Sequence, residues 1–225
     1  MAGWHVKAAI FLTTVIVCLD MAPETDYRQR LREVLQRKSV VRGRVKLASG
    51  QESDYYIDCR RTTLDPEGAF LTARAILELL DQQKIEADAI AGPPIAAYPI
   101  VAAVAAVSYQ RAKLEGKGKL LPALLIRKER KEHGLQKQIE GLDPEKMRSV
   151  VIVDDVCTTG ESTLQALAAA EEAGLKVVAV LSLVDREAGG SEKIRQKYRY
   201  FPLFTARELL QDDAQRSRVA DPAPC

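Results

Sequence analysis

Short, mainly apolar runs recur along the chain, and polar or turn-forming residues separate them. The most regular runs lie at 88–91, 123–126, 150–153 and 177–184, and strand-like composition also occurs at 54–59 and 198–201. Runs of four to eight residues rich in Val, Ile and Leu are typical of strands buried on both faces of a sheet. The pattern therefore predicts a sheet whose strands are mostly parallel.

Helical periodicity fills most of the intervals between these runs. Helices are predicted at 25–38, 65–81, 97–111 and 161–173, with shorter helices at 189–197 and 206–211. Thr25 is a candidate N-cap, Pro66 stands at a first helical position, and Gly174 is a candidate C-cap. Strands that alternate with helices indicate an α/β fold, in which helices flank a central sheet.

Two intervals depart from this alternation. Residues 43–50 are turn-like, and residues 127–146 form a long polar stretch without clear periodicity. Long loops inside compact domains are usually functional lids. We therefore expect the second interval to take part in function.

Length and composition limit the classes that remain. A chain of 225 residues corresponds to one domain, and 47% hydrophobic with 28% charged residues excludes wholesale disorder. The net charge of +2 is too small to indicate nucleic-acid binding by electrostatics alone. The four cysteines form no CxxC pair and there are only two histidines, so we expect reduced thiols, no zinc site and a cytosolic protein.

The first twenty residues differ from the rest. Ala8 to Leu19 is an apolar run that is too short to span a membrane, although it has the length of a signal-peptide core. No small-x-small cleavage pattern follows it, and Met21 opens an ordinary polar start. We expect residues 1–20 to be a mis-assigned start or a loose extension, with an added structural segment or a real signal peptide as alternatives. Residues 21–225 are predicted to form a single domain.

The segment VVIVDDVCTTGEST at 150–163 carries the strongest chemical signal. Two acids follow a buried strand, and a turn rich in Thr, Gly and Ser then opens a helix. Ligands of open α/β sheets bind at the carboxyl ends of strands, and a helix start offers free N–H groups to a phosphate. Neighbouring carboxylates suit sugar hydroxyls, or a metal ion held through water. The combination predicts a sugar-phosphate site.

Adjacent acids after a strand also occur in ATPases and phospho-acceptor receivers. However, the chain contains neither a GxxxxGK[ST] motif nor a GxGxxG motif. The segment resembles the phosphoribosyl-pyrophosphate (PRPP) motif of type I phosphoribosyltransferases. The resemblance implies that the acids hold the ribose hydroxyls and that the turn binds the 5-phosphate. It assigns PRPP binding to Asp154, Asp155, Val156, Cys157, Thr158, Thr159, Gly160, Glu161 and Ser162.

A mixed charge run, RKERKEHG, occupies residues 127–134. Such a run alone is usually a solvated surface, but this one begins at the end of a buried strand and opens the long loop. Together with Ile139-Glu140-Gly141, it resembles the catalytic loop of orotate phosphoribosyltransferases. That resemblance implies pyrophosphate contacts from Arg127, Lys128, Lys131 and His133. It also implies that Lys131 and His133 act in catalysis with the two acids and are donated across a homodimer interface.

Two further segments resemble the same family. Residues 47–60 look like its N-terminal hood, and Val184 to Glu187 looks like the segment whose arginine binds orotate, although a lone VDRE is otherwise a strand end with an exposed ion pair. By this resemblance, orotate contacts Thr158, Arg186, Tyr56 and Ile57. The chain departs from the family at Ala48 and Gln51, where many members carry a hood lysine, and in GPPIAAYP at 92–99, which carries Pro94, Ala96 and Tyr98.

The resemblance implies a complete reaction. Orotate and PRPP give orotidine 5′-monophosphate and pyrophosphate, and Mg²⁺ is held through PRPP and water and not directly by the protein. The implied fold is a mostly parallel central sheet flanked by helices, with an N-terminal hood and a long flexible catalytic loop. A phosphoribosyltransferase for another base, and a non-catalytic PRPP-sensing regulator, are the alternatives. The expected location is cytoplasmic, without a nucleic-acid or membrane partner.

Overall fold

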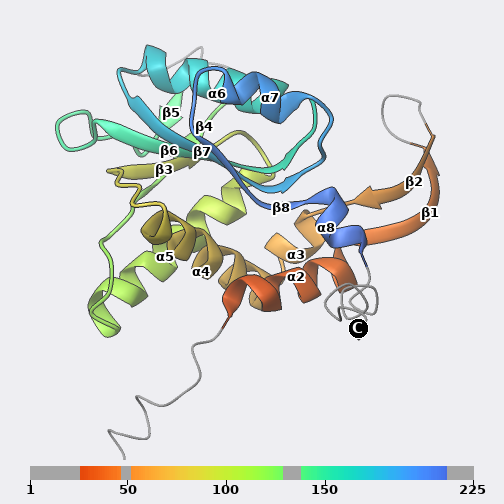
Figure 1. The fold of residues 1–225 in the computed structure, drawn as a ribbon. Helices are drawn as coiled ribbons and strands as arrows, with labels where there is room; N and C mark the ends of the chain where they lie inside the picture. The colour runs from red at the N-terminus through yellow and green to blue at the C-terminus, as the bar shows by residue number, and fades with distance from the viewer. Residues whose placement is uncertain (1–25, 47–51, 129–137, 212–225) are drawn as a thin grey trace, which may run out of the picture.

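A six-stranded sheet forms the centre of the computed structural model, which describes residues 26–46, 52–128 and 138–211 (Figure 1). The strand order is β5-β4-β3-β6-β7-β8. The strands are β3 (Ala89–Gly92), β4 (Ala123–Ile126), β5 (Ile139–Glu140), β6 (Ser149–Cys157), β7 (Lys176–Asp185) and β8 (Tyr200–Thr205). All neighbours pair in parallel except β4 and β5, which are antiparallel. The predicted, mostly parallel sheet is confirmed.

Helices cover both faces of this sheet. In Figure 1, α6 (Glu161–Glu172) and α7 (Gly190–Arg195) lie above it, and α4 (Pro66–Gln82) and α5 (Ala97–Leu114) lie below it. Successive residues of a strand point to opposite faces. Val150 and Ile152 accordingly pack in one apolar cluster with Leu167 of α6, whereas Val151 and Val153 pack in the other. Burial on both faces explains why β6 reads as an unbroken apolar run in sequence.

A smaller unit, which we call the hood, stands beside the sheet. It comprises α2 (Tyr27–Lys38), the antiparallel hairpin of β1 (Val40–Lys46) and β2 (Glu52–Ile57), α3 (Arg60–Thr63) and the C-terminal helix α8 (Ala206–Leu210). The two ends of the described chain therefore meet in this unit, as Figure 1 shows. The expected N-terminal hood is present, and α8 from the other end of the chain completes it.

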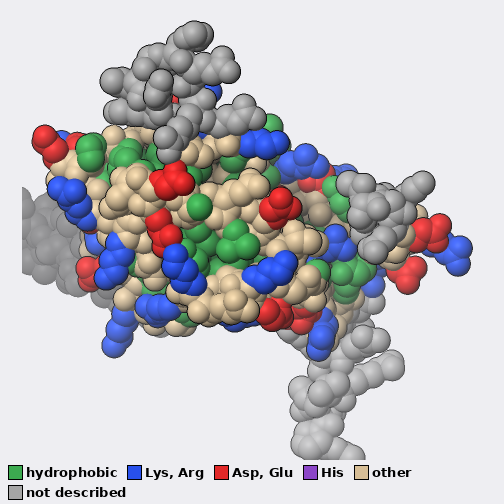
Figure 2. Space-filling view, turned by 90° about the horizontal axis from the view of Figure 1, so that it is seen from above, with side chains coloured by type: hydrophobic (Ala, Val, Ile, Leu, Met, Phe, Trp, Pro, Cys, Tyr) green, Lys and Arg blue, Asp and Glu red, His purple; other side chains and the backbone are tan. Residues whose placement is uncertain are grey.

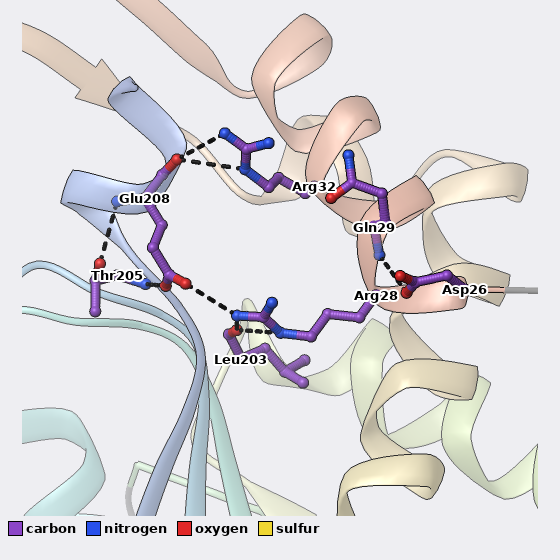
Figure 3. A network of polar contacts seen from close by, with 7 residues as sticks. All are labelled: Asp26, Arg28, Gln29, Arg32, Leu203, Thr205 and Glu208. Atoms are coloured by element: carbon purple, nitrogen blue, oxygen red, sulfur yellow. Dashed lines mark hydrogen bonds and ion pairs between the residues drawn. The ribbon is translucent and has the colours of Figure 1, made fainter. Parts of the chain in front are cut away.

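Within the hood, arginines of α2 hold α8 and the end of β8 in place (Figure 3). Arg28 donates through Nη2 to the Leu203 carbonyl oxygen at 2.8 Å and to the Glu208 carboxylate at 3.1 Å. Arg32, which is 1% exposed, donates to the Glu208 carbonyl oxygen at 3.2 Å. The Arg32 contact satisfies a carbonyl group near the end of α8, which has no partner inside the helix itself, and the Arg28 contact ties α2 to strand β8.

The longer helices follow the sequence prediction closely, although Asp26 and not Thr25 caps α2, and the four-residue helix α3 was not predicted. Several strands differ from the prediction, and β8 continues to Thr205 beyond the predicted end at 201. The stretch at 43–50 was expected to be a turn, but β1 extends to Lys46 and pairs with β2 across a register shift beyond Arg42, with Gly43 at φ 116°. A short strand, β5, lies inside the interval that was expected to be irregular. Strand β6 continues four residues beyond the predicted end at Val153, because β7 still pairs with it as far as Cys157.

The view from the α6 and α7 side shows Lys and Arg side chains interspersed with Asp and Glu around a small apolar area (Figure 2). Along the described chain, no helix is both long and apolar enough to cross a membrane. Cys59 and Cys157 are buried free thiols. The predicted extension at 1–20 and the central part of the catalytic loop, 129–137, lie outside the described residues.

Candidate active site

The turn between β6 and α6, residues Cys157–Ser162, is called the phosphate turn below. Asp154, at 4% exposure, lies just before it and fastens it in place. One carboxylate oxygen accepts from the Asp155 backbone N–H at 2.9 Å, and the other accepts from the Ser162 and Thr163 hydroxyls at 2.9 and 2.8 Å. A carboxylate with three donors is well satisfied in a buried position. Asp154 therefore joins the end of the strand to the first turn of the helix.

The neighbouring carboxylate has a different environment. Burial, together with repulsion from Asp154, raises the pKa of Asp155 to about 7. No Lys or Arg of the described chain forms an ion pair with either acid, although ion pairs are common elsewhere in it. The pair therefore has no balancing cation among the described residues at the carboxyl edge of the sheet, and Asp155 is only partly ionised near neutral pH. Such a pair suits hydroxyl donors or a hydrated divalent cation.

The phosphate turn leaves the start of α6 open. Gly160 is the N-cap residue at φ 75°, and no side chain caps the helix. The exposed residues Thr159 and Ser162 add hydroxyl groups beside the backbone N–H groups of the first turn. Free N–H groups and the positive end of the helix dipole favour a bound anion at such a position. The geometry fits the phosphate role predicted for these residues.

A pocket of about 230 Å³ opens next to this turn, at the ends of β3 and β4. It is lined by Pro93, Pro94, Ile126, Arg127, Lys128, Gln138, Ser162, Gln165 and Ala166. Gly92 allows β3 to lie close to β6, because a Cβ at this position would lie 2.5 Å from the Val153 carbonyl oxygen. The start of α5 at Ala96 also lacks a side-chain cap. A second helix start without a side-chain cap thus lies on the same edge of the sheet.

Only some of the basic residues predicted to contact pyrophosphate belong to the described part of the chain. The Arg127 guanidinium forms an ion pair with Glu140 at 2.8 Å, and Lys128 is exposed. Lys131 and His133, the two predicted catalytic residues of the loop, lie outside the described residues, as do the hood positions Ala48 and Gln51. Of the four predicted pyrophosphate contacts, the structure thus brings Arg127 and Lys128 to the pocket.

The opposite side of the phosphate turn carries Arg186. Its backbone N–H donates to the Cys157 carbonyl oxygen at 2.9 Å, and its guanidinium lies 5.3 Å from the ring centroid of Tyr55 in the hood. The sequence predicted Tyr56 and Ile57 on this side of the site, and the structure places Tyr55 against Arg186. Ile57 is 5% exposed in the core, and Tyr56 lies on the other face of β2 from Tyr55. The Tyr-Tyr pair was visible in sequence, but its register was not.

A buried thiol lies near the acid pair. Burial is the main cause that raises the pKa of Cys59 well above its usual value, and the negative charge of Asp155 is the second cause. The thiol therefore stays protonated at neutral pH, which leaves it a weak nucleophile. Among the described residues, no group of three or more His, Cys, Asp or Glu side chains could hold a metal ion.

A larger pocket, of about 270 Å³, lies away from all of these groups. It is lined by residues near the ends of α4 and α5, including Leu77, Asp81 and Arg111, and by the segments that follow these two helices. None of the predicted site residues borders it. The chemistry of the polar groups, and not the size of a cavity, therefore identifies the carboxyl edge as the candidate site.

Comparison with known proteins gives consistent results. Residues 63–212 match the family described as phosphoribosyl transferase domain. The chain is 44% identical over 172 residues to an orotate phosphoribosyltransferase of Streptomyces coelicolor, covering 76% of this chain and 89% of that one. It is 36% identical over 182 residues to an orotate phosphoribosyltransferase of Pyrococcus furiosus, covering 80% and 93%.

The structure is also similar to solved ones. It matches the Mycobacterium tuberculosis orotate phosphoribosyltransferase in complex with PRPP at a TM-score of 0.64 and 31% identity, covering 81% of this chain and 98% of that one. The complex of the same enzyme with Fe(III) dicitrate matches at a TM-score of 0.69 and 34% identity, covering 82% and 99%.

Proposed function

The chain belongs to the phosphoribosyl transferase domain family, and we infer that it carries out the reaction named for its relatives, the transfer of the phosphoribosyl group from PRPP to orotate. The products are orotidine 5′-monophosphate and pyrophosphate, so the protein acts in pyrimidine biosynthesis. One observation supports this most directly. The open phosphate turn, the uncompensated acid pair and Arg186 occupy one edge of the sheet, and Arg186 is hydrogen-bonded to the turn itself.

The reaction breaks the bond between C1 of the ribose and the pyrophosphate. Positive charge develops on the sugar and negative charge on the leaving group, so positioning and electrostatics supply most of the catalysis. Asp155 is proposed to accept hydrogen bonds from the ribose hydroxyls and to stabilise the developing positive charge. The two oxygens of Asp154 are already bonded within the protein, so its first task is to hold the turn beneath the ribose.

The phosphate turn is proposed to bind the 5-phosphate. Backbone N–H groups at the start of α6 face it, with hydroxyls from Thr158 and Thr159, and the Ser162 hydroxyl, which donates to Asp154 in the structure, must turn away from that carboxylate to join them. Gly160 allows the left-handed bend at φ 75° that opens the turn. Because no side chain caps α6, the phosphate takes the place of a cap.

Pyrophosphate leaves on the other side, towards the pocket at the ends of β3 and β4. Arg127 and Lys128 border that pocket, and Lys131 and His133 are proposed to come from the catalytic loop of a partner subunit in a homodimer. Arg127 must turn from Glu140 to make a bidentate contact with phosphate. Lysine acts as a mobile point charge, and His133 donates a hydrogen bond to the leaving group.

The acid pair also fits a role for Mg²⁺. This ion prefers oxygen ligands and keeps several waters, and it is usually bound through one or two carboxylates together with substrate phosphates. Asp155 offers such a carboxylate without a competing ion pair in the described chain. When bound, Mg²⁺ neutralises charge on the pyrophosphate. We propose that it is held through PRPP and water, in a cytoplasmic enzyme.

The base side is proposed to be built from Arg186 and Tyr55. Orotate carries a carboxylate, and arginine matches a carboxylate with two parallel N–H donors. The Tyr55 ring beneath the guanidinium holds it in place. A neutral base offers no such charge to Arg186, which argues against the alternative of another base.

The test is the loss of orotate's ultraviolet absorbance in the presence of the full chain, PRPP and Mg²⁺, with uracil and adenine run in parallel. PRPP-dependent loss with orotate alone supports the proposed function. Turnover of another base instead would contradict the base assignment. PRPP binding without turnover of any base would favour the regulator.

A further inference from the structure

The end of β7 is tied to the phosphate turn by two backbone hydrogen bonds. We call residues Asp185–Gly190 the linking loop. Pairing of β6 with β7 continues to Cys157 and Asp185, where the strands end. Beyond that point, Arg186 N–H donates to the Cys157 carbonyl oxygen at 2.9 Å, and Gly190 N–H donates to the Thr158 carbonyl oxygen at 3.0 Å. The linking loop therefore runs along the phosphate turn after regular pairing has ceased.

Gly190 makes this contact possible because it has no side chain. A Cβ there would lie 2.5 Å from both the Gly160 nitrogen and the Thr158 carbonyl oxygen, and 2.7 Å from the Thr159 carbonyl carbon. All three are backbone atoms of the phosphate turn, so they cannot move aside without moving the turn. Position 190 requires glycine because there is no room for a side chain. Its backbone conformation does not require glycine, since its φ is not positive.

The path of the linking loop depends on the unusual backbone conformation of Glu187. Glu187 adopts φ 55°, in the left-handed region that is unfavourable for a residue with a Cβ. Asp185, which is 2% exposed, accepts a hydrogen bond from the Glu187 N–H at 2.9 Å and thereby holds this bend. The other carboxylate oxygen of Asp185 lies 4.0 Å from Arg195, whose guanidinium stacks on the Tyr200 ring.

We propose that Asp185 and Gly190 are positioning residues that hold the phosphate turn and Arg186 in a fixed relative position. This proposal rests on the function inferred above. Asp185 sets the bend, the bend brings Gly190 against the turn, and Arg186 lies between the two. The PRPP side and the orotate side of the site thus share one rigid element, and a displacement of the loop reaches both substrates.

The first test replaces Gly190 by Ala in the full chain. The new Cβ must push the phosphate turn away, so KM for PRPP and KM for orotate are both expected to rise by about tenfold or more. The matched control is Gly68→Ala, whose Cβ would lie 2.2 Å from the Thr62 carbonyl oxygen, far along the chain from the turn. The control is expected to lower the melting temperature and leave both KM values unchanged.

The second test separates positioning from stability. Asp185→Ala removes the acceptor for Glu187 N–H and is expected to raise both KM values, whereas Asp185→Asn keeps an acceptor oxygen and is expected to stay close to wild type. Adding Glu187→Gly to Asp185→Ala is expected to restore part of the loss, because glycine adopts a positive φ without steric cost. A merely destabilised protein would not recover its KM values in this way.

Several results would overturn the proposal. They are wild-type KM values in Gly190→Ala, an equal rise in Gly68→Ala, or a rise for PRPP alone. Calorimetric PRPP titration of the wild type separates this inference from the proposed function. If the wild type binds PRPP but consumes no orotate, the proposed function is wrong, and the PRPP affinity of Gly190→Ala still decides the role of the linking loop. A wild type that binds no PRPP overturns both.

Discussion

The hood and the carboxyl edge of the sheet treat the ends of their helices in opposite ways. In and beside the hood, side chains cap three helix starts, and among the described helices of that region only the four-residue α3 lacks a cap: Asp26 bonds to Gln29 N–H, Asp65 to Gly68 N–H, and Thr205 to Glu208 N–H. Arg32 of α2 also donates to the Glu208 carbonyl group of α8 (Figure 3). This region uses its polar side chains to satisfy its own backbone.

At the carboxyl edge, α5 and α6 both begin without a side-chain cap. A cap contributes about 1 kcal/mol to stability, and neither helix start has one in a chain that caps helices elsewhere. Unsatisfied backbone groups at a concave, charged edge are expected where a ligand completes them. The difference between the regions therefore separates polar groups that stabilise the fold from those that are available to substrate.

Asp154 and Asp155 show the same division between a group that stabilises the fold and a group that is available to substrate. Asp154 accepts three hydrogen bonds from the protein, whereas Asp155 has a pKa raised to about 7 by burial and by its neighbour. One acid holds the turn, and the other is the acid that we propose to accept the ribose hydroxyls. Variants of the two acids are the most direct way to test the comparison.

The largest effect is expected from Asp155→Asn. The change keeps the shape and removes the charge that faces the ribose, so kcat/KM should fall by about a hundredfold or more. At pH 8 the melting temperature should rise slightly, because repulsion from Asp154 disappears. Steady-state kinetics and thermal unfolding of the same sample measure both effects. An unchanged kcat/KM would remove Asp155 from the site.

Asp154→Ala is the matched contrast. It leaves the Ser162 and Thr163 hydroxyls and the Asp155 N–H without their acceptor, and it should lower the free energy of unfolding by about 1–3 kcal/mol. Activity should fall too, but in step with a lower melting temperature. If stability stayed at the wild-type level, the two acids would not differ in the way described.

The next effect concerns the hood. Arg32→Met keeps the buried stem but removes the donors to the Glu208 and Gln211 carbonyl oxygens. Leaving such acceptors unpaired should lower the free energy of unfolding by about 2–3 kcal/mol. Urea unfolding measures this change. KM for PRPP, measured well below the melting temperature, should equal that of the wild type, and a tenfold rise would show that the two regions are coupled.

A smaller effect on stability and on PRPP affinity is expected when the pH is changed. An unfolded aspartate has a pKa near 3.9, so between about pH 4 and pH 7 the folded state keeps a proton on Asp155 that the unfolded state has lost. The contribution of Asp155 to stability therefore decreases as pH rises through this window and is constant above it. PRPP affinity should instead increase as the pH rises through about 7, because the ionised form of folded Asp155 is proposed to accept the ribose hydroxyls.

Melting temperatures of wild type and Asp155→Asn across this pH range measure the effect. The variant should show a flatter profile, and its PRPP affinity should lose the rise with pH. Parallel profiles for the two proteins would contradict the raised pKa.

Much of this arrangement could be predicted from sequence because local patterns determine it. The apolar run at Val150–Val153 predicts a strand buried on both faces, and Asp65-Pro66 predicts the start of α4 to the residue. The predicted strand ended too early because acids interrupt the apolar pattern, whereas backbone pairing with β7 continues to Cys157. Gly43 similarly suggested a turn, but pairing with β2 outweighs its preference.

What could not be predicted depends on contacts between distant segments. Gly190 packs against the phosphate turn thirty positions earlier, and no local pattern marks which glycine of the Gly189-Gly190 pair makes that contact. The choice between Tyr55 and Tyr56 depends on which face of β2 meets Arg186. Residue types indicated the chemistry of the site, but register and packing decide which side chains reach it.

The smallest effect is expected at the cap of α8. Thr205 accepts from Glu208 N–H at 3.1 Å, and Glu208 accepts in return from Thr205 N–H at 2.7 Å. Thr205→Ala removes the first bond and should lower the free energy of unfolding by about 1 kcal/mol, whereas Thr205→Ser keeps a hydroxyl and should cost less. Neither change should alter KM for PRPP or orotate. An altered KM without a loss of stability would mean that this cap serves the site, and the division between hood and carboxyl edge would then fail at its simplest point.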